Sequence, residues 1–241
     1  MRDSILAALR EQYGEEKVEL LVRYMERILE YNEHINLTAV TDPTEFLMKH
    51  MLDSLAAVSL PSFQKAKIVI DIGTGGGFPG VPLAVLAPEK EFVLLDSLKK
   101  RLYVIDELTE ELGIRNVTTV HARVEDLGQD PNYRETFDLA VSRAVASLDI
   151  LSEWCLPLVR KGGCFLSYKG EKAEEEAKEA SKAIAVLGGE IRSFEAQELG
   201  VYPQEVSEAI GGHRLIVIRK VNPTPRKYPR KPGLAKKNPI R

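Results

Sequence analysis

The segment Asp71-Ile72-Gly73-Thr74-Gly75-Gly76-Gly77-Phe78-Pro79-Gly80 decides the fold of this chain. An apolar run, Ile68 to Ile70, precedes it, and a helix-like run, Val81 to Leu86, follows it. A strand, a glycine loop and a helix in this order are typical of an open α/β sheet that binds a nucleotide-like ligand at the loop. Glycines there permit positive φ angles and let backbone N–H groups approach a ligand that a Cβ atom would block.

A second apolar run, Phe92 to Leu95, ends in Asp96. An acid about 20 residues beyond the glycine loop suits a ribose, because a carboxylate accepts hydrogen bonds from both ribose hydroxyls. We therefore expect Asp96 to contact the sugar of the ligand.

Asp71 indicates which of the ligands compatible with this pattern the site binds. A dinucleotide places its diphosphate against the glycine turn, where a carboxylate two residues before the first glycine would repel it. S-adenosylmethionine carries an ammonium and a sulfonium group but no phosphate, so an acid is compatible with it. The pattern D-x-G-x-G-x-G, with Gly73, Gly75 and Gly77, followed by a strand-ending acid resembles motifs I and II of class I methyltransferases. A nicotinamide site or an empty structural turn is the alternative.

The bulk composition is ordinary for a soluble globular protein: the chain has 241 residues, of which 44% are hydrophobic and 29% are charged. No apolar stretch approaches the ~20 residues that a membrane span requires. Cys155 and Cys164 are isolated, with no CxxC or histidine spacing, so the sequence predicts neither a metal site nor a disulfide. The first residues contain no signal-peptide core, and we expect a cytoplasmic protein.

The net charge of −3 hides an uneven distribution, because no acidic residue follows Glu208. A basic, proline-rich end on a mildly acidic protein indicates contact with an anionic polymer, although such an end can also serve solubility alone. The basic residues of this region are Arg214, Arg219, Lys220, Arg226, Lys227, Arg230, Lys231, Lys236, Lys237 and Arg241.

The chain divides into three predicted parts: an N-terminal helical cap over 1–62, a Rossmann-like core over 63–221 and a basic tail over 222–241. An apolar stripe at helical spacing supports the cap, in which Asp42 and Pro43 are expected to start a further helix. In the core, strands alternating with helices predict a mostly parallel sheet with helices on both faces. Its strands are expected at 68–71, 92–96, 117–120, 137–142, 163–168, 188–194 and 213–220.

His50 and Asp53 lie three positions apart, hence on one face of the predicted helix. They are either a surface pair or a site in which His50 acts as a base. A Ser-His-Asp hydrolase is rejected, because no G-x-S-x-G segment exists and Ser54 adjoins Asp53 on the wrong face.

Arg143 ends the fourth predicted strand, which faces the transferable methyl group in class I methyltransferases. Neither an Asn-Pro-Pro-aromatic run nor a cysteine nucleophile stands there. An arginine at this place can bind a phosphate, a carboxylate or guanine O6 and N7, or it can form a structural ion pair with Asp138 or Asp149. Lys169, after the fifth strand, is either a substrate contact or a solvent-facing lysine.

Two further side chains are candidates for the cofactor. Glu125 follows the third predicted strand, where it can face an adenine ring, although an exposed acid at a helix start is the alternative. Phe78 can pack on the adenosine or shape the glycine loop.

These residues together resemble the glucose-inhibited division protein B family, the bacterial small-subunit ribosomal RNA guanine-N7 methyltransferases. The resemblance spans nearly the whole chain, and the segments flanking the glycine loop make it specific. The family's loop often differs at positions 76 and 78, so those side chains are not essential to the chemistry. The matching segments are Asn36-Leu37-Thr38, His50, Asp53-Ser54, Asp71 to Gly80, Leu95-Asp96-Ser97, Arg123-Val124-Glu125, Ser142-Arg143-Ala144, Lys169-Gly170 and Tyr228 to Gly233.

The resemblance implies methyl transfer from S-adenosylmethionine to N7 of one guanine in 16S rRNA of the small ribosomal subunit. The cofactor contacts that it implies are Gly73, Phe78, Val124, Glu125 and Arg143, to which the residues' own chemistry adds Asp71, Gly75, Gly77 and Asp96. Substrate positioning is expected from Asn36, His50, Asp53, Arg143 and Lys169, and RNA phosphate contacts from Arg226, Lys227, Arg230 and Lys231. No metal is expected.

Guanine N7 bears an in-plane lone pair, so attack on the methyl group needs no general base and leaves no proton to remove. Positioning then supplies much of the rate, up to roughly 7–11 kcal/mol in favourable cases. The rival interpretations are a small-molecule methyltransferase on the same core and a non-catalytic assembly factor that keeps the cofactor pocket; a nicotinamide dehydrogenase is more distant.

Overall fold

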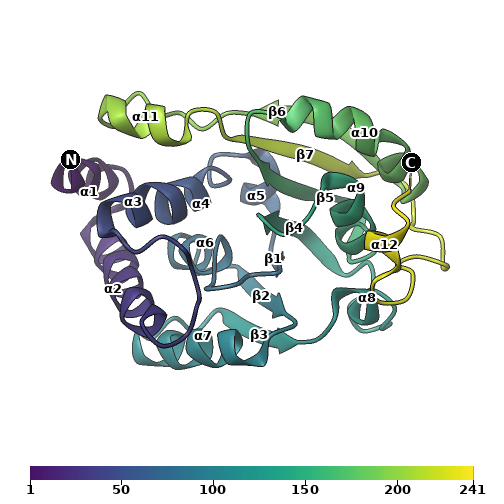
Figure 1. Ribbon diagram of the computed structural model, residues 1–241, viewed down its shortest axis with the longest axis horizontal. Helices are drawn as coiled ribbons and strands as arrows, with labels where there is room; N and C mark the ends of the chain where they lie inside the picture. The colour runs from purple at the N-terminus through teal and green to yellow at the C-terminus, as the bar shows by residue number, and fades with distance from the viewer. Residues whose placement is uncertain (241) are drawn as a thin grey trace.

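A seven-stranded sheet forms the centre of the protein, in a computed structural model that describes residues 1–240 (Figure 1). Arg241, the last basic residue of the predicted tail, lies outside the described residues. The strands are β1 (Ile68–Ile72), β2 (Glu91–Asp96), β3 (Val117–His121), β4 (Phe137–Arg143), β5 (Val159–Lys169), β6 (Gly189–Glu195) and β7 (Arg214–Lys220). All seven correspond to strands expected from the sequence, although β5 begins at Val159 rather than at 163.

The strand order is β3-β2-β1-β4-β5-β7-β6. The first five strands pair in parallel, and β7 runs antiparallel to both β5 and β6. The predicted mostly parallel sheet is therefore confirmed, and the carboxyl ends of β1 to β5 meet at one edge. In open sheets of this kind a ligand binds beyond those ends.

Helices cover both faces of the sheet, as predicted. Successive residues of β1 point to opposite sides, so Val69 packs into one apolar cluster and Ile70 into the other. Strands buried on both faces need continuous apolar runs, which explains the composition of β1. The helices are α1 (Arg2–Tyr13), α2 (Glu15–Asn32), α3 (Pro43–Phe46), η1 (Leu47–Leu52), α4 (Asp53–Leu55), α5 (Pro61–Lys65), α6 (Gly80–Leu86), α7 (Lys99–Glu111), α8 (Val124–Leu127), α9 (Leu148–Cys155), α10 (Ala173–Val186), α11 (Gln204–Ile210) and α12 (Leu234–Lys237).

The N-terminal helices pack directly on the sheet's covering helices. The Tyr24 hydroxyl donates to the Gly76 carbonyl at 2.9 Å, and Lys17 Nζ donates to the Leu86 carbonyl at 2.9 Å. Asp42 caps α3 by accepting from the Glu45 amide at 2.8 Å, which confirms the predicted helix start. That helix does not continue as a regular α-helix, because η1 is a π-helix, and π-helical turns are frequent at functional sites.

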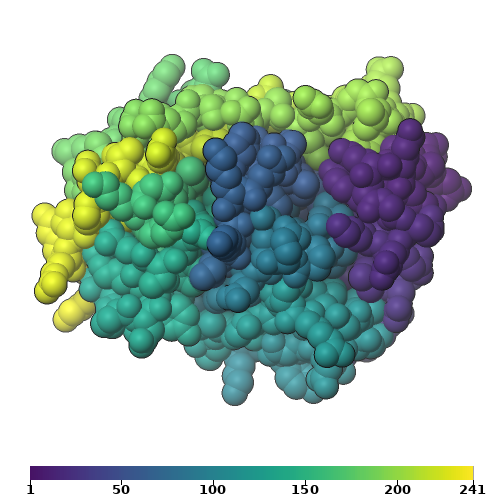
Figure 2. Space-filling model, turned by 180° about the vertical axis from the view of Figure 1, so that it is seen from behind, coloured from purple at the N-terminus to yellow at the C-terminus, as the bar shows by residue number. Residues whose placement is uncertain are grey.

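Residues 222–240, here termed the C-terminal strap, run over α8 and α9 rather than away from the core (Figure 1). Arg134 fixes the strap by donating to the carbonyls of Tyr228 at 2.7 Å and Thr224 at 2.8 Å. Gln129 donates to the Pro229 carbonyl at 2.7 Å. The predicted basic tail is thus a docked segment at the opposite end of the molecule from the N-terminal helices (Figure 2).

Lys220, which the sequence places among the basic residues near this end, is fully buried in β7. It pairs with Glu135 at 2.9 Å and donates to the Leu156 carbonyl. Lys220 is therefore part of the core and not part of a basic surface. No helix within residues 1–240 combines the length and the apolar composition needed to cross a bilayer.

Candidate active site

Two pockets open at the carboxyl edge of the sheet, and Ala144 lines both of them. Ala144 has a φ of 55°, an uncommon angle for a residue with a Cβ atom, and it directly follows β4. The glycine-loop pocket is lined by Ile72, Gly73, Leu95, Asp96, Ser97, Leu98, Arg101, Ala122, Arg123, Val124, Glu125, Ala144, Val145, Trp154 and Lys236. The arginine pocket is lined by Lys49, His50, Asp53, Arg143, Ala144, Tyr168, Lys169, Gly170, Glu176 and His213.

Asp71 lies under the glycine loop rather than in either pocket. Its buried Oδ2 accepts from Thr74 Oγ1 at 2.6 Å and from the Gly80 amide at 2.9 Å, which ties the two ends of the loop together. Burial raises the pKa of this carboxyl to about 6. The structure thus gives Asp71 a role in shaping the loop, and a direct cofactor contact by Asp71 stays a prediction.

Among the three glycines of the motif, Gly73 alone lines the glycine-loop pocket. Its φ is 72°, and a Cβ atom there would lie 2.7 Å from the Val145 side chain. Gly77 has a φ of 90°, and a Cβ atom there would collide with the Tyr24 hydroxyl. Gly75 donates its amide to Asp96 Oδ2 at 3.0 Å. Gly75 and Gly77 therefore shape the loop.

Asp96 lies where the sequence places it, at the end of β2 and on the pocket wall. Its Oδ2 accepts from the Gly75 amide and its Oδ1 from the Leu98 amide at 2.8 Å. Oδ2 also accepts from Arg101 Nη1 at 3.5 Å, so of the two oxygens Oδ1 keeps one acceptor position for a ligand hydroxyl. This geometry suits the predicted ribose contact.

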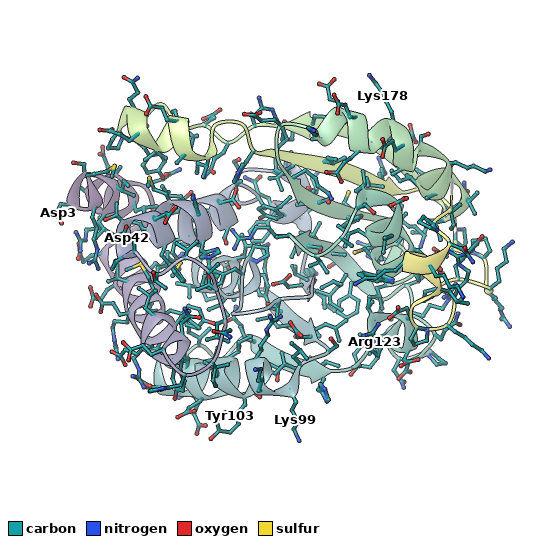
Figure 3. The ribbon with its side chains drawn as sticks, viewed as in Figure 1. Asp3, Asp42, Lys99, Tyr103, Arg123 and Lys178 are labelled. Carbon is teal, nitrogen blue, oxygen red and sulfur yellow. The ribbon has the colours of Figure 1, made fainter. Side chains whose placement is uncertain are left out.

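Glu125 is 2% exposed, so the alternative of an exposed acid is wrong. Oε1 accepts from the Gly233 amide of the strap at 3.0 Å, while the buried Oε2 has no hydrogen-bond donor and lies 3.6 Å from Arg123 Nε. Figure 3 shows Arg123 on the strap's side of the molecule. Val124 also lines the pocket, as the resemblance implies.

Trp154 on α9 and Lys236 on the strap also line this pocket, although the sequence predicted a place there for neither. The Lys236 ammonium lies 5.3 Å from the centroid of a Trp154 ring, and Trp154 Nε1 is buried without a hydrogen-bond partner. An unpaired buried N–H is costly and favours a ligand acceptor in this pocket. Only the docking of the strap brings Lys236 here, and nothing in its local sequence indicates that.

Phe78 lies away from the glycine-loop pocket, in an aromatic cluster under the cap. Its ring centroid is 5.9 Å from that of Tyr24, 5.4 Å from Phe46 and 5.3 Å from His50, on which it stacks. Phe78 therefore shapes the loop in this structure, and its predicted contact with the adenosine stays a prediction.

Arg143 joins the end of β4 to the cap. Nη1 donates to Asp53 Oδ2 at 2.8 Å and to the Lys49 carbonyl at 2.9 Å, and Nη2 donates to His50 Nδ1 at 2.9 Å. The expected alternative pair with Asp138 is wrong, since Asp138 binds Arg160 at 2.6 Å. Arg143 lines the arginine pocket and not the glycine-loop pocket, so its implied cofactor contact stays a prediction.

His50 uses both ring nitrogens. A guanidinium has only donors, so Nδ1 must accept from Arg143, and Nε2 then carries the proton and donates to Thr38 Oγ1 at 2.7 Å. Burial, together with the Arg143 charge, lowers the pKa of His50 to about 4. His50 is thus a neutral positioning residue here, and the geometry offers no nitrogen for a base.

Thr38 comes from the Asn36-Leu37-Thr38 turn. The Asn32 side chain holds this turn by accepting from the amides of Leu37 at 2.8 Å and Thr38 at 2.9 Å. Asn36 itself is exposed and lines neither pocket, so its predicted substrate contact is not supported by a place in the site.

Asp53 accepts from two side chains that are distant in the sequence. Besides Arg143, its Oδ1 accepts from His213 Nδ1 at 2.8 Å. Burial raises the pKa of this carboxyl, but the hydrogen bond from His213 and the charge of Arg143 outweigh it, and the net pKa is lowered. His213, at the start of β7, was not singled out from the sequence. Ser54 donates to the His50 carbonyl, which agrees with the absence of a Ser-His-Asp site.

The Lys169 side chain is only 9% exposed and lines the arginine pocket, so the solvent-facing alternative is wrong. Nζ lies 2.6 Å from Glu176 Oε2 and donates to the Ala146 carbonyl at 2.9 Å. Glu176 was likewise not singled out, because it belongs to an acidic run that is typical of a solvated helix face. Within residues 1–240, no group of three or more His, Cys, Asp or Glu side chains is placed to hold a metal ion.

The four predicted RNA contacts of the strap differ in their surroundings. Arg226, Lys227 and Lys231 are exposed. Arg230 is half-buried, and its guanidinium binds the buried Glu153 at 2.6 Å. Three of the four are thus exposed on the strap, while Arg230 anchors it to α9.

Residues 17–201 match the family model GidB, described as rRNA small subunit methyltransferase G. The chain is 43% identical over 229 residues to ribosomal RNA small subunit methyltransferase G of Clostridium novyi, covering 95% of this chain and 91% of the relative. It is 46% identical over 226 residues to the protein of the same description from Desulfitobacterium hafniense, covering 93% and 90%.

Solved structures with the same fold include the O-methyltransferase from Bacillus cereus in complex with SAH, with a TM-score of 0.55, 20% identity and coverage of 82% and 91%. The Methanococcus jannaschii fibrillarin pre-rRNA processing protein matches with a TM-score of 0.54, 12% identity and coverage of 73% and 77%. At these identities the likeness concerns the fold, which is that of class I methyltransferases.

Proposed function

Because this chain belongs to the rRNA small subunit methyltransferase G family, we propose that it methylates N7 of one guanine in 16S rRNA. Membership confirms the resemblance drawn from the sequence: the chain is an S-adenosylmethionine-dependent methyltransferase of ribosomal RNA. The base, the atom and the small subunit as physical partner are the finer parts of the proposal. An rRNA substrate also agrees with the predicted cytoplasmic location.

The glycine-loop pocket fits S-adenosylmethionine. Its lining residues include three buried polar atoms without hydrogen-bond partners, Arg101 Nε, Glu125 Oε2 and Trp154 Nε1, and an adenine ring has acceptors and a donor that suit such atoms. Asp96 Oδ1, which accepts only from the Leu98 amide, keeps a lone pair for the ribose, and Gly73 leaves the space beside Val145 open. When bound, the cofactor supplies an electrophilic methyl group.

One observation carries the placement of the substrate: Ala144 lines both pockets. A base held in the arginine pocket therefore lies next to a cofactor held in the glycine-loop pocket, on the two sides of one residue. The base must leave its stack to enter, as enzymes that act on single bases require.

The chemistry of the arginine pocket suits an attack that needs no general base. His50 has both nitrogens engaged, and Asp53 accepts from Arg143 and His213, so neither is placed to remove a proton. The N7 lone pair needs only alignment with the methyl group. Arg143, His50 and Asp53 supply a rigid wall that keeps the base in place, which is how positioning contributes to the rate.

Three exposed cations of the strap, Arg226, Lys227 and Lys231, are suited to neutralising rRNA phosphates. They lie on the same segment that delivers Lys236 to the glycine-loop pocket. Binding of RNA along the strap would therefore bring the polymer close to the transfer site.

The test is methyl transfer from labelled S-adenosylmethionine to unmethylated 30S subunits and, in parallel, to naked 16S rRNA. Mass spectrometry of the nucleosides should show 7-methylguanosine at one position. Preference for 30S subunits would support the subunit as the partner. Cofactor binding without RNA labelling would instead favour a small-molecule methyltransferase or a non-catalytic assembly factor.

A further inference from the structure

Lys169 and Glu176 form an ion pair on the wall of the arginine pocket that methyl transfer itself does not require. Lys169 ends β5, and Glu176 lies in the first turns of α10, with Nζ and Oε2 2.6 Å apart. The Lys169 side chain is 9% exposed and that of Glu176 is 32% exposed. A half-buried pair at the mouth of a substrate pocket is a candidate for recognition.

Both groups keep hydrogen-bonding capacity. An ammonium has three N–H donors, and Lys169 directs them at only two acceptors, the Ala146 carbonyl and Glu176. Glu176 contacts Lys169 through its buried Oε2, which leaves the other carboxylate oxygen, Oε1, to accept from a ligand. Within the described residues, no cation other than Lys169 is paired with Glu176. The pocket wall thus presents one donor beside one acceptor.

We propose that Lys169 and Glu176 select guanine, with Lys169 donating to O6 and Glu176 accepting from N1–H. This inference rests on the proposed function above. Guanine presents an acceptor, O6, beside a donor, N1–H, whereas adenine presents a donor, the N6 amino group, beside an acceptor, N1. An adenine in this pocket would place its amino group against the ammonium and its N1 lone pair against the carboxylate. Sites with fixed polar groups discriminate strongly against such mismatches.

The same pair determines which atom faces the cofactor. Along the edge of guanine the groups follow the order N2, N1, O6 and N7. Along the pocket wall the order is Glu176, Lys169 and then the loop of Ala146 and Ala144, because Lys169 Nζ bridges Glu176 and the Ala146 carbonyl. With O6 on Lys169, N7 comes next to Ala144, which borders the glycine-loop pocket.

The other Lys and Arg side chains that line the pocket, Lys49 and Arg143, are less suited to this task, and Lys49 is paired with Glu45. Arg143 already donates to Asp53, His50 and the Lys49 carbonyl, and its side chain is held by the cap. The donors of Arg143 therefore hold the wall of the pocket in place, whereas Lys169 and Glu176 can form hydrogen bonds with the base.

The experiment compares wild type with Glu176→Ala on 16S rRNA assembled by ligation around an oligonucleotide that carries guanosine, inosine or 2-aminopurine riboside at the target position. Inosine keeps O6 and N1–H, and 2-aminopurine lacks both. In wild type we expect inosine to react nearly as well as guanosine and 2-aminopurine to react far less. In Glu176→Ala, the guanosine rate constant kcat/KM should fall by roughly 10- to 100-fold, with a much smaller loss on 2-aminopurine.

Glu175→Ala is the matched control, since Glu175 is exposed on the same helix and lines no pocket of this site. Glu176→Gln, which keeps the shape, replaces the alanine variant if the latter does not bind S-adenosylmethionine normally. Equal losses on guanosine and 2-aminopurine, or no loss on guanosine, would overturn the inference while leaving the proposed function intact. Absence of 7-methylguanosine with wild type would overturn the proposed function, and the inference with it.

Discussion

Arg143 at the end of β4 and Asp53 in the cap form a buried ion pair of 2.8 Å between residues that are 90 positions apart in the sequence. Asp53 also accepts from His213 at the start of β7. The Asp53 carboxylate therefore connects the cap to the end of β4 and to the residue that directly precedes the antiparallel strand β7. The wall of the arginine pocket depends on this junction.

Replacing Asp53 by Asn should lower the free energy of unfolding by about 3–5 kcal/mol, because it leaves Arg143 buried without a counter-charge. Urea unfolding followed by circular dichroism measures the change. Asp3→Asn is the control, since Asp3 is exposed near the N-terminus (Figure 3) and should cost at most about 1 kcal/mol. If the two variants had equal free energies of unfolding, the ion pair of Asp53 with Arg143 would not be what stabilises the packing of the cap.

The stability of the protein should depend on pH through His50. Its folded pKa of about 4 lies below the ordinary value of 6.5, so the native state favours the neutral ring. This contribution is fully present above about pH 6.5 and is lost as the pH falls toward 4, by about 3 kcal/mol in total.

The measurement is the difference in unfolding free energy between wild type and His50→Gln from pH 7 to pH 4. The difference should shrink as the pH falls, because the variant has no ring to protonate. His34→Gln, at an exposed histidine, should run parallel to wild type. A pH-independent difference for His50→Gln would contradict the buried neutral ring.

Arg143→Lys tests whether Arg143 serves the substrate or the cofactor. Lysine keeps the charge but cannot reach Asp53, His50 and the Lys49 carbonyl together. Since Arg143 lines only the arginine pocket, kcat/KM for RNA should fall by roughly 10- to 100-fold while the Kd for S-adenosylmethionine changes less than about threefold.

Calorimetry and methyl-transfer kinetics give the two values. Arg160→Lys is the matched control, because Arg160 is exposed and pairs with Asp138 outside both pockets. A large loss of cofactor affinity in Arg143→Lys would instead support the cofactor contact that the family resemblance implies.

Charge reversal of Arg226, Lys227 and Lys231 to Glu should weaken RNA binding and flatten its salt dependence. Loss of three phosphate contacts lowers the slope of log K against log salt by about 2 to 3. The free energy of cofactor binding should not change, since none of the three lines the glycine-loop pocket. Arg230 is left intact because its ion pair with Glu153 anchors the strap.

In the control variant, three exposed lysines elsewhere on the protein are replaced by Glu: Lys161, Lys178 and Lys182. Lys178 points away from the body of the protein on α10 (Figure 3). Filter binding over a range of salt concentrations measures both slopes. A slope that is unchanged in the strap variant would exclude these three residues as phosphate contacts.

The sequence by itself determined the strands, the glycine loop and the places of Asp96 and Glu125 on the pocket wall. These features depend on short-range patterns: alternating or continuous apolar runs, a glycine cluster, and an acid at the end of a strand. Because the carboxyl ends of parallel strands meet at one edge, the position of a residue at a strand end already places it near the ligand.

The tertiary structure alone decided which side chains are partners. From the sequence, Asp138 or Asp149 is the expected ion-pair partner of Arg143, whereas in the structure Arg143 pairs with Asp53. It also brought Glu176 to Lys169, His213 to Asp53 and Gly233 to Glu125. No local pattern encodes such contacts, because they form only when segments far apart in the chain pack together, and packing is a property of the whole core.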